Sequence, residues 1–187
     1  MRITKTLHRA LLAAMTLLTA LPAAAHPGHG TGSGFLAGLL HPVTGIDHLL
    51  ALLAVGLWSR QQRHGVVLAP TFLVLMALGA ASAGGVVLPA LELSIAATVL
   101  LLGALAACAP ELQRRVPPSI AVATVGACAF VHGLAHGNEL GGTASSAGFL
   151  LASALLMLAG AATGERLRRL VGAAIGSAGV WLLALAA

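Results

Sequence analysis

The sequence predicts an all-α membrane protein with six transmembrane helices after a cleaved signal peptide, and three observations predict it. Hydrophobic residues make up 58% of the chain and charged residues only 8%, which is outside the range of soluble globular proteins. The apolar residues come in blocks of about 16 to 24, each long enough to cross a hydrocarbon layer about 30 Å thick. Past residue 25, arginines occur only in alternate separators between these blocks.

The chain begins with the features of a secretory signal peptide. Arg2, Lys5 and Arg9 precede an apolar run over residues 10–21, and the small residues 23–25 provide a site for signal peptidase. The alternative is an uncleaved seventh helix, but a run of about 12 apolar residues is short for a membrane span.

Three segments follow from this interpretation. We expect residues 1–25 to be removed as the signal peptide, and residues 26–33 to form a His- and Gly-rich N-terminus outside the membrane. Residues 34–187 are expected to form a six-helix transmembrane domain.

Six apolar blocks follow the N-terminal segment, and each is predicted to form one transmembrane helix. Their separators are short and rich in Gly, Pro, Arg or Ser, so that no loop can contain a second domain. The predicted spans are 34–57, 66–83, 88–108, 119–136, 146–162 and 170–185.

The arginines predict the orientation of these helices. The first, third and fifth separators contain all seven arginines that follow residue 25, and the second and fourth contain none. Because positive residues concentrate in short cytoplasmic loops, both termini are expected on the opposite side. The first three helices then run opposite in sense to the last three, which is the arrangement of inverted-topology repeats in secondary transporters.

Charge and cysteine content exclude several classes of function. The net charge of +5 does not indicate a nucleic-acid-binding protein, because the positive residues are not gathered on one face. Lys5 is the only lysine, so the chain alone lacks the lysine that a P-loop ATPase needs. Cys108 and Cys128 form no Cys-x-x-Cys pair and are interpreted as packing residues. Gly172 and Gly176 are spaced for close helix packing.

The first predicted helix contains His41, Asp47 and His48. Ionisable residues within a span usually mark a site or a pathway, because each costs about 2.5 to 3.5 kcal/mol at the bilayer centre. On a straight helix the two histidines would lie about 10.5 Å apart along the axis, too far to share one metal ion. Pro42 and Gly45 predict a kinked or partly unwound helix between them. Alternatively, the proline only kinks the helix and the aspartate pairs with a histidine.

The fourth predicted helix ends with His132 and His136, one turn apart on the same face. Their side chains can share one ion, and imidazole suits nickel, copper, zinc and iron. Glu139 could join them or guide ions from outside. Alternatively, both histidines hydrogen-bond to neighbouring helices. A zincin hydrolase would need a glutamate where Gly133 stands.

Depth in the membrane relates the two helices, because the first enters from outside and the fourth leaves to outside. His41, His132 and His136 are therefore expected in the outer half, where they would form an external mouth. Asp47 and His48 are expected nearer the midplane.

The mature N-terminus would present a free amine with His26 and His29 to the outer compartment. It is interpreted either as a tail that captures metal ions or as a tail that is simply disordered.

The segments His41-Pro42-x-x-Gly45-x-Asp47-His48 and His132-Gly133-x-Ala135-His136-Gly137-x-Glu139 resemble the motifs of the HupE/UreJ family, as does the start His26-Pro27-Gly28-His29 after a signal peptide. The resemblance implies a permease of the bacterial inner membrane, with both mature termini in the periplasm. It implies nickel as the transported ion, with cobalt as an alternative, for hydrogenase or urease maturation. It implies no enzyme activity and no resident cofactor. The metal-binding residues would be His41, Asp47, His48, His132, His136 and Glu139, with His26 and His29 in the tail.

Two other classes stay open from the residues alone, which indicate only a divalent metal. An intramembrane hydrolase would hold zinc on His132, His136 and an acidic residue. A haem protein would take two axial histidines from facing helices. The expected partners are a divalent metal ion and the lipid bilayer, without nucleic acid, and the sequence indicates no oligomeric state.

Overall fold

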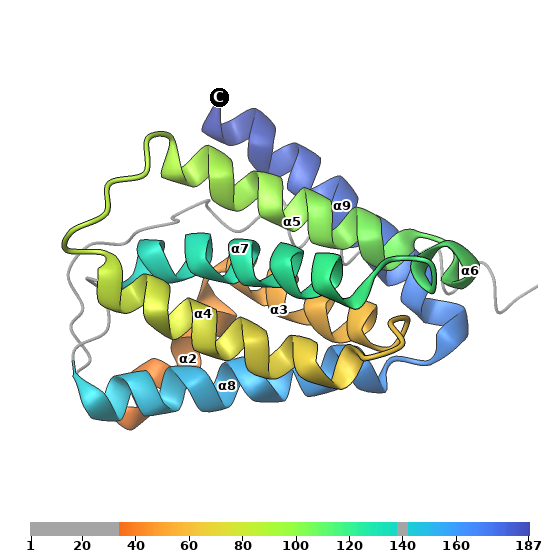
Figure 1. Ribbon diagram of the computed structural model, residues 1–187. Coiled ribbons are helices and arrows are strands. Elements are labelled where there is room, and N and C mark those ends of the chain that lie inside the picture. The colour runs from red at the N-terminus through yellow and green to blue at the C-terminus, as the bar shows by residue number, and fades with distance from the viewer. Residues whose placement is uncertain (1–33, 138–141) are drawn as a thin grey trace, which may run out of the picture. The chain divides into compact units, whose positions relative to one another are not determined.

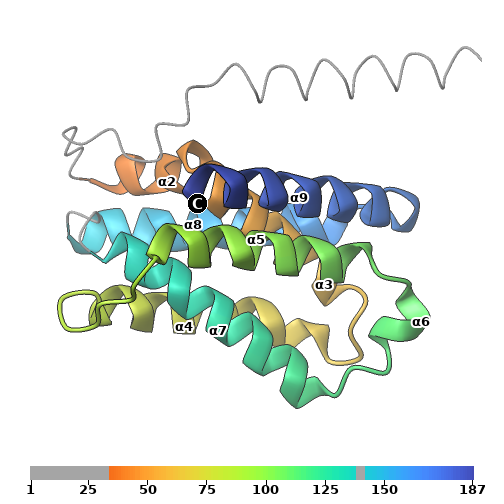
Figure 2. The same ribbon diagram turned by 90° about the horizontal axis from the view of Figure 1, so that it is seen from above.

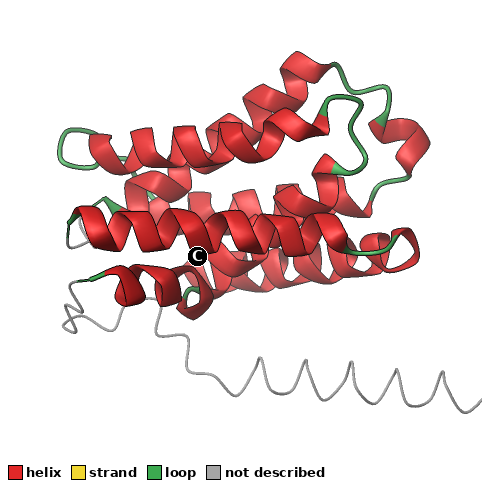
Figure 3. Ribbon diagram, turned by 90° about the horizontal axis from the view of Figure 1, so that it is seen from below, coloured by secondary structure: helices red, strands yellow, loops and turns green. Residues whose placement is uncertain are grey.

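The computed structural model describes residues 34–137 and 142–187, which belong to the compact unit Thr31–Ala187. Within these residues there are helices, turns and loops but no β-strand, so the all-α prediction is confirmed for this part of the chain (Figure 3). The predictions for residues 1–25 and 26–33 lie outside the described residues, as does Glu139. The elements in chain order are α2 (Phe35–Thr44), α3 (Ile46–Ser59), the 3-10 helix η1 (Gly65–Val67), α4 (Leu68–Ser82), α5 (Leu91–Ala107), α6 (Pro110–Gln113), α7 (Pro118–His136), α8 (Thr143–Ala162) and α9 (Glu165–Ala186).

Each predicted span coincides with one helix or one pair of helices. Four helical segments of the described chain are long and apolar enough to cross a membrane: Gly65–Ser82, Pro118–His136, Thr143–Ala162 and Glu165–Ala186. The pair α2 and α3 adds a fifth if it is counted as one broken span. Helix α5 is apolar and has 17 residues, at the lower end of the length needed to cross a bilayer.

The first predicted span is broken at Gly45, and α2 and α3 meet there at an angle of 84°. Pro42 inside α2 lacks the N–H that would continue the helical hydrogen bonds, and Gly45 is extended, with φ −88° and ψ 110°. The Gly45 N–H still donates to the His41 carbonyl at 3.4 Å, and the Thr44 hydroxyl donates to the same oxygen at 2.8 Å. The predicted break between the two histidines of this segment is confirmed.

The last helix begins earlier than predicted. The region 163–169 was expected to be a loop, but α9 starts at Glu165 and takes in all three of its arginines. Arginine is a good helix former, and a glutamate in the first turn complements the positive end of the helix dipole, so a polar stretch continues the apolar helix. Helix α8 likewise begins at Thr143, three residues before its predicted start.

Helix α3 occupies the centre of the described bundle. Its five consecutive residues from Ala54 to Trp58 are all buried, and five consecutive helical residues point in every direction around the axis. Helix α8 lies along α2 and α3, α4 along α7, and α5 along α9 (Figures 1 and 2). At the last of these contacts, a Cβ on Gly172 would overlap the backbone of Ala107, so the close packing predicted for this glycine pair is confirmed.

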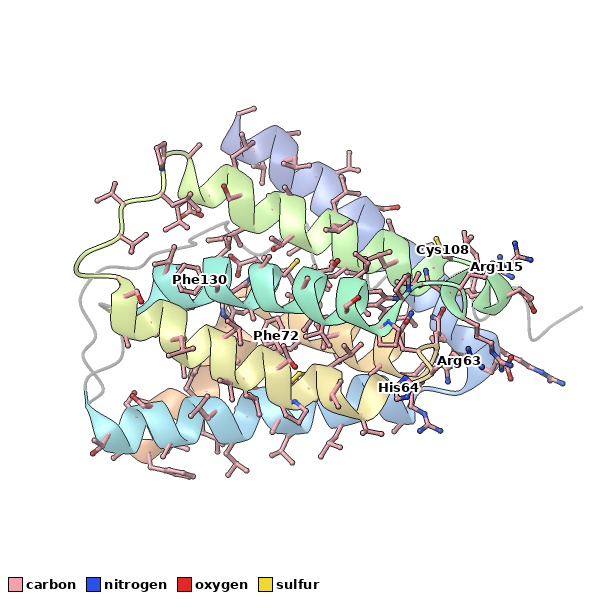
Figure 4. The ribbon with its side chains drawn as sticks, viewed as in Figure 1. Arg63, His64, Phe72, Cys108, Arg115 and Phe130 are labelled. Carbon is pink, nitrogen blue, oxygen red and sulfur yellow. The ribbon has the colours of Figure 1, made fainter. Side chains whose placement is uncertain are left out.

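The segments that contain arginine meet at one end of the bundle. Arginines from the α3–η1 loop, the α6 loop and the first turn of α9 line two cavities that share Gln61. Figure 4 shows nitrogen-rich side chains gathered at this end, around Arg63 and Arg115, whereas carbon predominates along the helices. The separators predicted to lie on one side of a membrane therefore do lie at one end of the structure.

Candidate metal site

Four histidines from three helices come together beside the break in the first span. His41 lies on α2, His48 on α3, and His132 and His136 on α7. The ring centroids of His41 and His136 are 4.7 Å apart, those of His48 and His136 are 3.9 Å apart, and those of His48 and His132 are 4.7 Å apart. Three of these side chains are buried, with exposures of 1% for His48, 0% for His132 and 8% for His136.

Three of the rings form a chain of hydrogen bonds. His41 Nε2 lies 2.9 Å from His136 Nδ1, and His136 Nε2 lies 2.8 Å from His48 Nδ1. In each pair one nitrogen donates and the other accepts, as the tautomers decide. The bend at Gly45 makes this arrangement possible, because it turns His41 back toward His136, whose ring also bonds to His48.

The fourth ring is held in a single tautomer by the backbone. His132 Nδ1 lies 3.0 Å from the carbonyl oxygen of Cys128, which can only accept, so Nδ1 donates and the lone pair lies on Nε2. Thr98 Oγ1 lies 3.3 Å from the same Nδ1. A backbone carbonyl that holds the distal nitrogen of an imidazole is the usual support of a metal-binding histidine.

Two buried imidazole nitrogens lack a hydrogen-bond partner among the residues that the structure describes. They are Nε2 of His48 and Nε2 of His132, and they belong to the two neighbouring rings whose centroids are 4.7 Å apart. Leaving a buried polar atom unsatisfied costs about 1 to 3 kcal/mol, so such an atom needs an explanation. A metal cation provides one when His48 Nδ1 donates to His136 Nε2, because His48 Nε2 then carries a lone pair, as His132 Nε2 does.

Aromatic side chains surround the histidines. The ring of Phe149 on α8 has its centroid 5.6 Å from those of His41 and His136 and 5.7 Å from that of His48. The ring centroid of Phe72 on α4, a buried residue labelled in Figure 4, lies 6.1 Å from that of His132. Neither phenylalanine was predicted to lie at the site, although the chain has only four phenylalanines and their scarcity could have marked them as candidates.

Asp47 lies next to His48 at the start of α3. Its side chain is 24% exposed, and its Oδ1 accepts a hydrogen bond from the backbone N–H of His48 at 2.7 Å. The carboxylate thus satisfies the first turn of α3 and complements its dipole, while 3.9 Å separates it from His48 Nδ1. The structure also places the ring of His132 beside that of His48, whereas His41 meets His136.

No point in the described part of the chain is surrounded by three or more His, Cys, Asp or Glu side chains arranged to hold a metal ion. The nitrogens of His41, His136 and His48 bond to one another instead. An ion bound by His41 or His136 would have to replace these hydrogen bonds with bonds to itself, whereas Nε2 of His48 and Nε2 of His132 can receive an ion without that exchange.

A model of the HupE / UreJ protein family matches residues 13–187. The chain belongs to the HupE/UreJ family. The Protein HupE of Rhizobium leguminosarum bv. viciae is 38% identical over 180 residues, which cover 88% of this chain and 92% of that relative. No solved structure matches the chain.

This HupE/UreJ chain brings together four of the predicted metal-binding residues and leaves a fifth beside them. The four are His41, His48, His132 and His136, and the fifth is Asp47, which serves the start of α3. The other three, His26, His29 and Glu139, lie outside the described residues.

Proposed function

We propose that this HupE/UreJ chain is a permease that carries nickel, or alternatively cobalt, across the bacterial inner membrane and supplies hydrogenase or urease maturation. The observation that carries the proposal is the pair of buried, unpartnered Nε2 atoms of His48 and His132. Neutral imidazoles bind nickel and cobalt well, and they leave the charge of the ion uncompensated. A site of this kind holds an ion long enough to select it and still releases it.

The proposal includes six membrane crossings, made by α2 with α3, η1 with α4, α5, α7, α8 and α9. The end with the arginines would face the cytoplasm and both mature termini the periplasm, because positive residues are retained in short cytoplasmic loops. The histidines would then lie toward the outer side, where the ion enters.

An inverted repeat of three plus three helices is supported by an internal similarity of sequence and packing. Leu75-Met76-x-x-Gly79-Ala80-Ala81 in α4 matches Leu156-Met157-x-x-Gly160-Ala161-Ala162 in α8. A Cβ on Gly133 of α7 would overlap the Met76 carbonyl, and a Cβ on Gly56 of α3 would overlap the Met157 carbonyl. The contact of α7 with α4 thus corresponds to the contact of α3 with α8, as repeats related by a pseudo-twofold axis in the membrane require.

Transport through this site needs no ATP. A divalent cation gains about 4.6 kcal/mol for each 100 mV of inside-negative potential, which is enough for accumulation by about three orders of magnitude. The ion would pass His41 and His136, reach Nε2 of His48 and Nε2 of His132, and leave toward the arginine end.

The test is uptake of radiolabelled nickel by cells that express single variants at equal levels. We expect His48→Ala and His132→Ala each to lower the initial rate at least about tenfold, because ligand loss costs more than loss of a supporting residue. The control is His64→Ala, which removes an exposed histidine at the arginine end (Figure 4). Wild-type uptake by both site variants would overturn the proposal.

A second measurement separates a carrier from the other two classes. A carrier is expected to lose nickel on gel filtration in detergent, whereas a zinc hydrolase would keep about one ion per chain. A bis-histidine haem protein would purify with a visible absorption band. Either tightly held zinc or haem would replace the permease proposal.

A further inference from the structure

The arginine end of the bundle contains a cavity of about 480 Å³ whose charged lining residues are all positive. It is lined by Arg60, Gln61, Gln62, Arg63 and Arg114. The three arginines are exposed, and no ion pair within the described residues engages them. Guanidinium groups that line one cavity without a carboxylate present donors suited to a phosphate group.

A buried amide network fixes the shape of this cavity. Gln113, which is 1% exposed, accepts hydrogen bonds from Trp58 Nε1 at 2.6 Å and from Gln62 Nε2 at 3.0 Å. Its own Nε2 donates to the Leu105 carbonyl at 2.8 Å. The loop that carries Arg114 is thereby held against the end of α3, so the cavity has a preformed wall.

Gln61, which lines this cavity, has a buried acceptor without a hydrogen-bond partner among the described residues. Gln61 is 5% exposed and donates to the Ala106 carbonyl at 2.7 Å, while its Oε1 is buried and has no partner among the described residues. A ligand that satisfies these groups offers an anionic phosphate to the arginines and a hydroxyl donor that reaches Gln61 Oε1 once this buried side chain shifts toward the cavity.

Exposed apolar residues close in sequence to the lining arginines favour a lipid over a free phosphate. Val66, close to Arg63 in the chain, is 85% exposed, and Leu112, close to Arg114, is 57% exposed. A phospholipid would cover such side chains with its acyl chains while its headgroup enters the cavity, whereas inorganic phosphate would leave them in water.

We propose that this cavity binds the headgroup of an anionic phospholipid with a free hydroxyl, of the phosphatidylglycerol type, from the leaflet that meets the arginine end. The phosphate is bound by Arg60, Arg63 and Arg114, and the headgroup hydroxyl donates to Gln61 Oε1 after a shift of that buried side chain toward the cavity. This site takes no part in metal binding, so it stands or falls independently of the nickel proposal.

The test is native mass spectrometry of the purified full chain in detergent, with added phosphatidylglycerol, phosphatidylethanol or phosphatidylcholine. Phosphatidylethanol has the same charge as phosphatidylglycerol but no headgroup hydroxyl. We expect phosphatidylglycerol to be retained best, phosphatidylethanol less, and phosphatidylcholine least. A parallel titration with inorganic phosphate should displace the lipid weakly or not at all.

Single variants locate the bound lipid. Arg63→Gln and Arg114→Gln are each expected to lower the apparent affinity for phosphatidylglycerol about fivefold, the usual effect of one basic residue at a membrane surface. The matched control is Arg115→Gln, which removes an exposed charge from the same loop but not from the cavity lining. An equal effect of the control, equal retention of phosphatidylcholine, or full displacement by inorganic phosphate would overturn the proposal.

Discussion

The Nε2 atom of His136 lies 2.8 Å from the Nδ1 atom of His48, and this hydrogen bond joins the end of α7 to the start of α3. The other nitrogen of His136 bonds to His41, so one ring connects three helices. The bond fixes the orientation of the His48 ring, on which the proposed metal binding at Nε2 depends.

Loss of the connecting ring should weaken nickel binding more than it slows the movement of bound nickel. We expect His136→Ala to raise the KM for nickel uptake about tenfold or more, the usual result of removing a residue that orients a metal ligand. His136→Gln keeps an amide that can donate and accept, so it should recover part of the affinity. An unchanged KM in His136→Ala would show that the bond has no part in the site.

The bend at Gly45 should depend on the two residues that disfavour a continuous helix. In the double variant Pro42→Ala/Gly45→Ala, α2 and α3 are expected to join, because proline and glycine together cost a helix about 4 kcal/mol relative to alanine. Spin labels at Leu36 and Arg60 would then approach the separation of about 36 Å that a straight helix imposes. Nickel uptake should fall in parallel, since His41 leaves the other rings.

The spin-label experiment requires a background in which Cys108 and Cys128 are alanine. Its control is Pro70→Ala, in the first turn of α4, where a proline does not interrupt the helix. A distance in the double variant equal to that of the parent would contradict the assigned cause of the bend.

Close helix packing at Gly133 should be sensitive to a single added methyl group. A Cβ at this position would overlap the Met76 backbone, so we expect Gly133→Ala to lower the stability by roughly 1 to 3 kcal/mol. Gly84→Ala is the control, because a Cβ there meets nothing within 4 Å. Thermal unfolding in detergent compares the two, and equal melting temperatures would count against the packing described for α4 and α7.

The buried amide of Gln113 should stabilise the arginine end through its acceptor oxygen. Gln113→Leu leaves the Trp58 N–H without its partner and is expected to cost roughly 1 to 3 kcal/mol. Gln113→Glu retains an acceptor and should cost less. Fluorescence of Trp58 in a Trp181→Phe background follows unfolding with one tryptophan, and a Leu variant as stable as the parent would contradict the prediction.

Apolar block length was enough to predict the helical segments, because a bilayer-sized run of Ala, Leu, Val and Gly has few structural alternatives. The break in the helix near Pro42 and Gly45 could also be predicted from the sequence, since both residues act on the local backbone. The start of α9 was misplaced because Arg166, Arg168 and Arg169 were taken as loop residues, whereas charged residues extend an apolar helix without penalty where they reach water.

The contacts between the histidines of different helices could not be predicted from one sequence. Which ring meets which depends on how α3 and α7 rotate against each other, and a helical spacing fixes only neighbours on one helix. The sequence placed Asp47 among the candidate metal ligands, but it could not show that Asp47 Oδ1 accepts a hydrogen bond from the His48 backbone N–H in the first turn of α3. Phe149 could not be predicted at the site, because its helix, α8, contains no histidine, cysteine or acidic residue.

All seven arginines of residues 34–187 are found at one end of the bundle, and this stretch contains no lysine. Trypsin cleaves after arginine and lysine, so it can attack the bundle from one side only. In sealed vesicles, molecules inserted one way would be cut into short fragments, while those inserted the other way would survive intact. The ratio of the two on a gel would give the fraction of each orientation without any engineered tag.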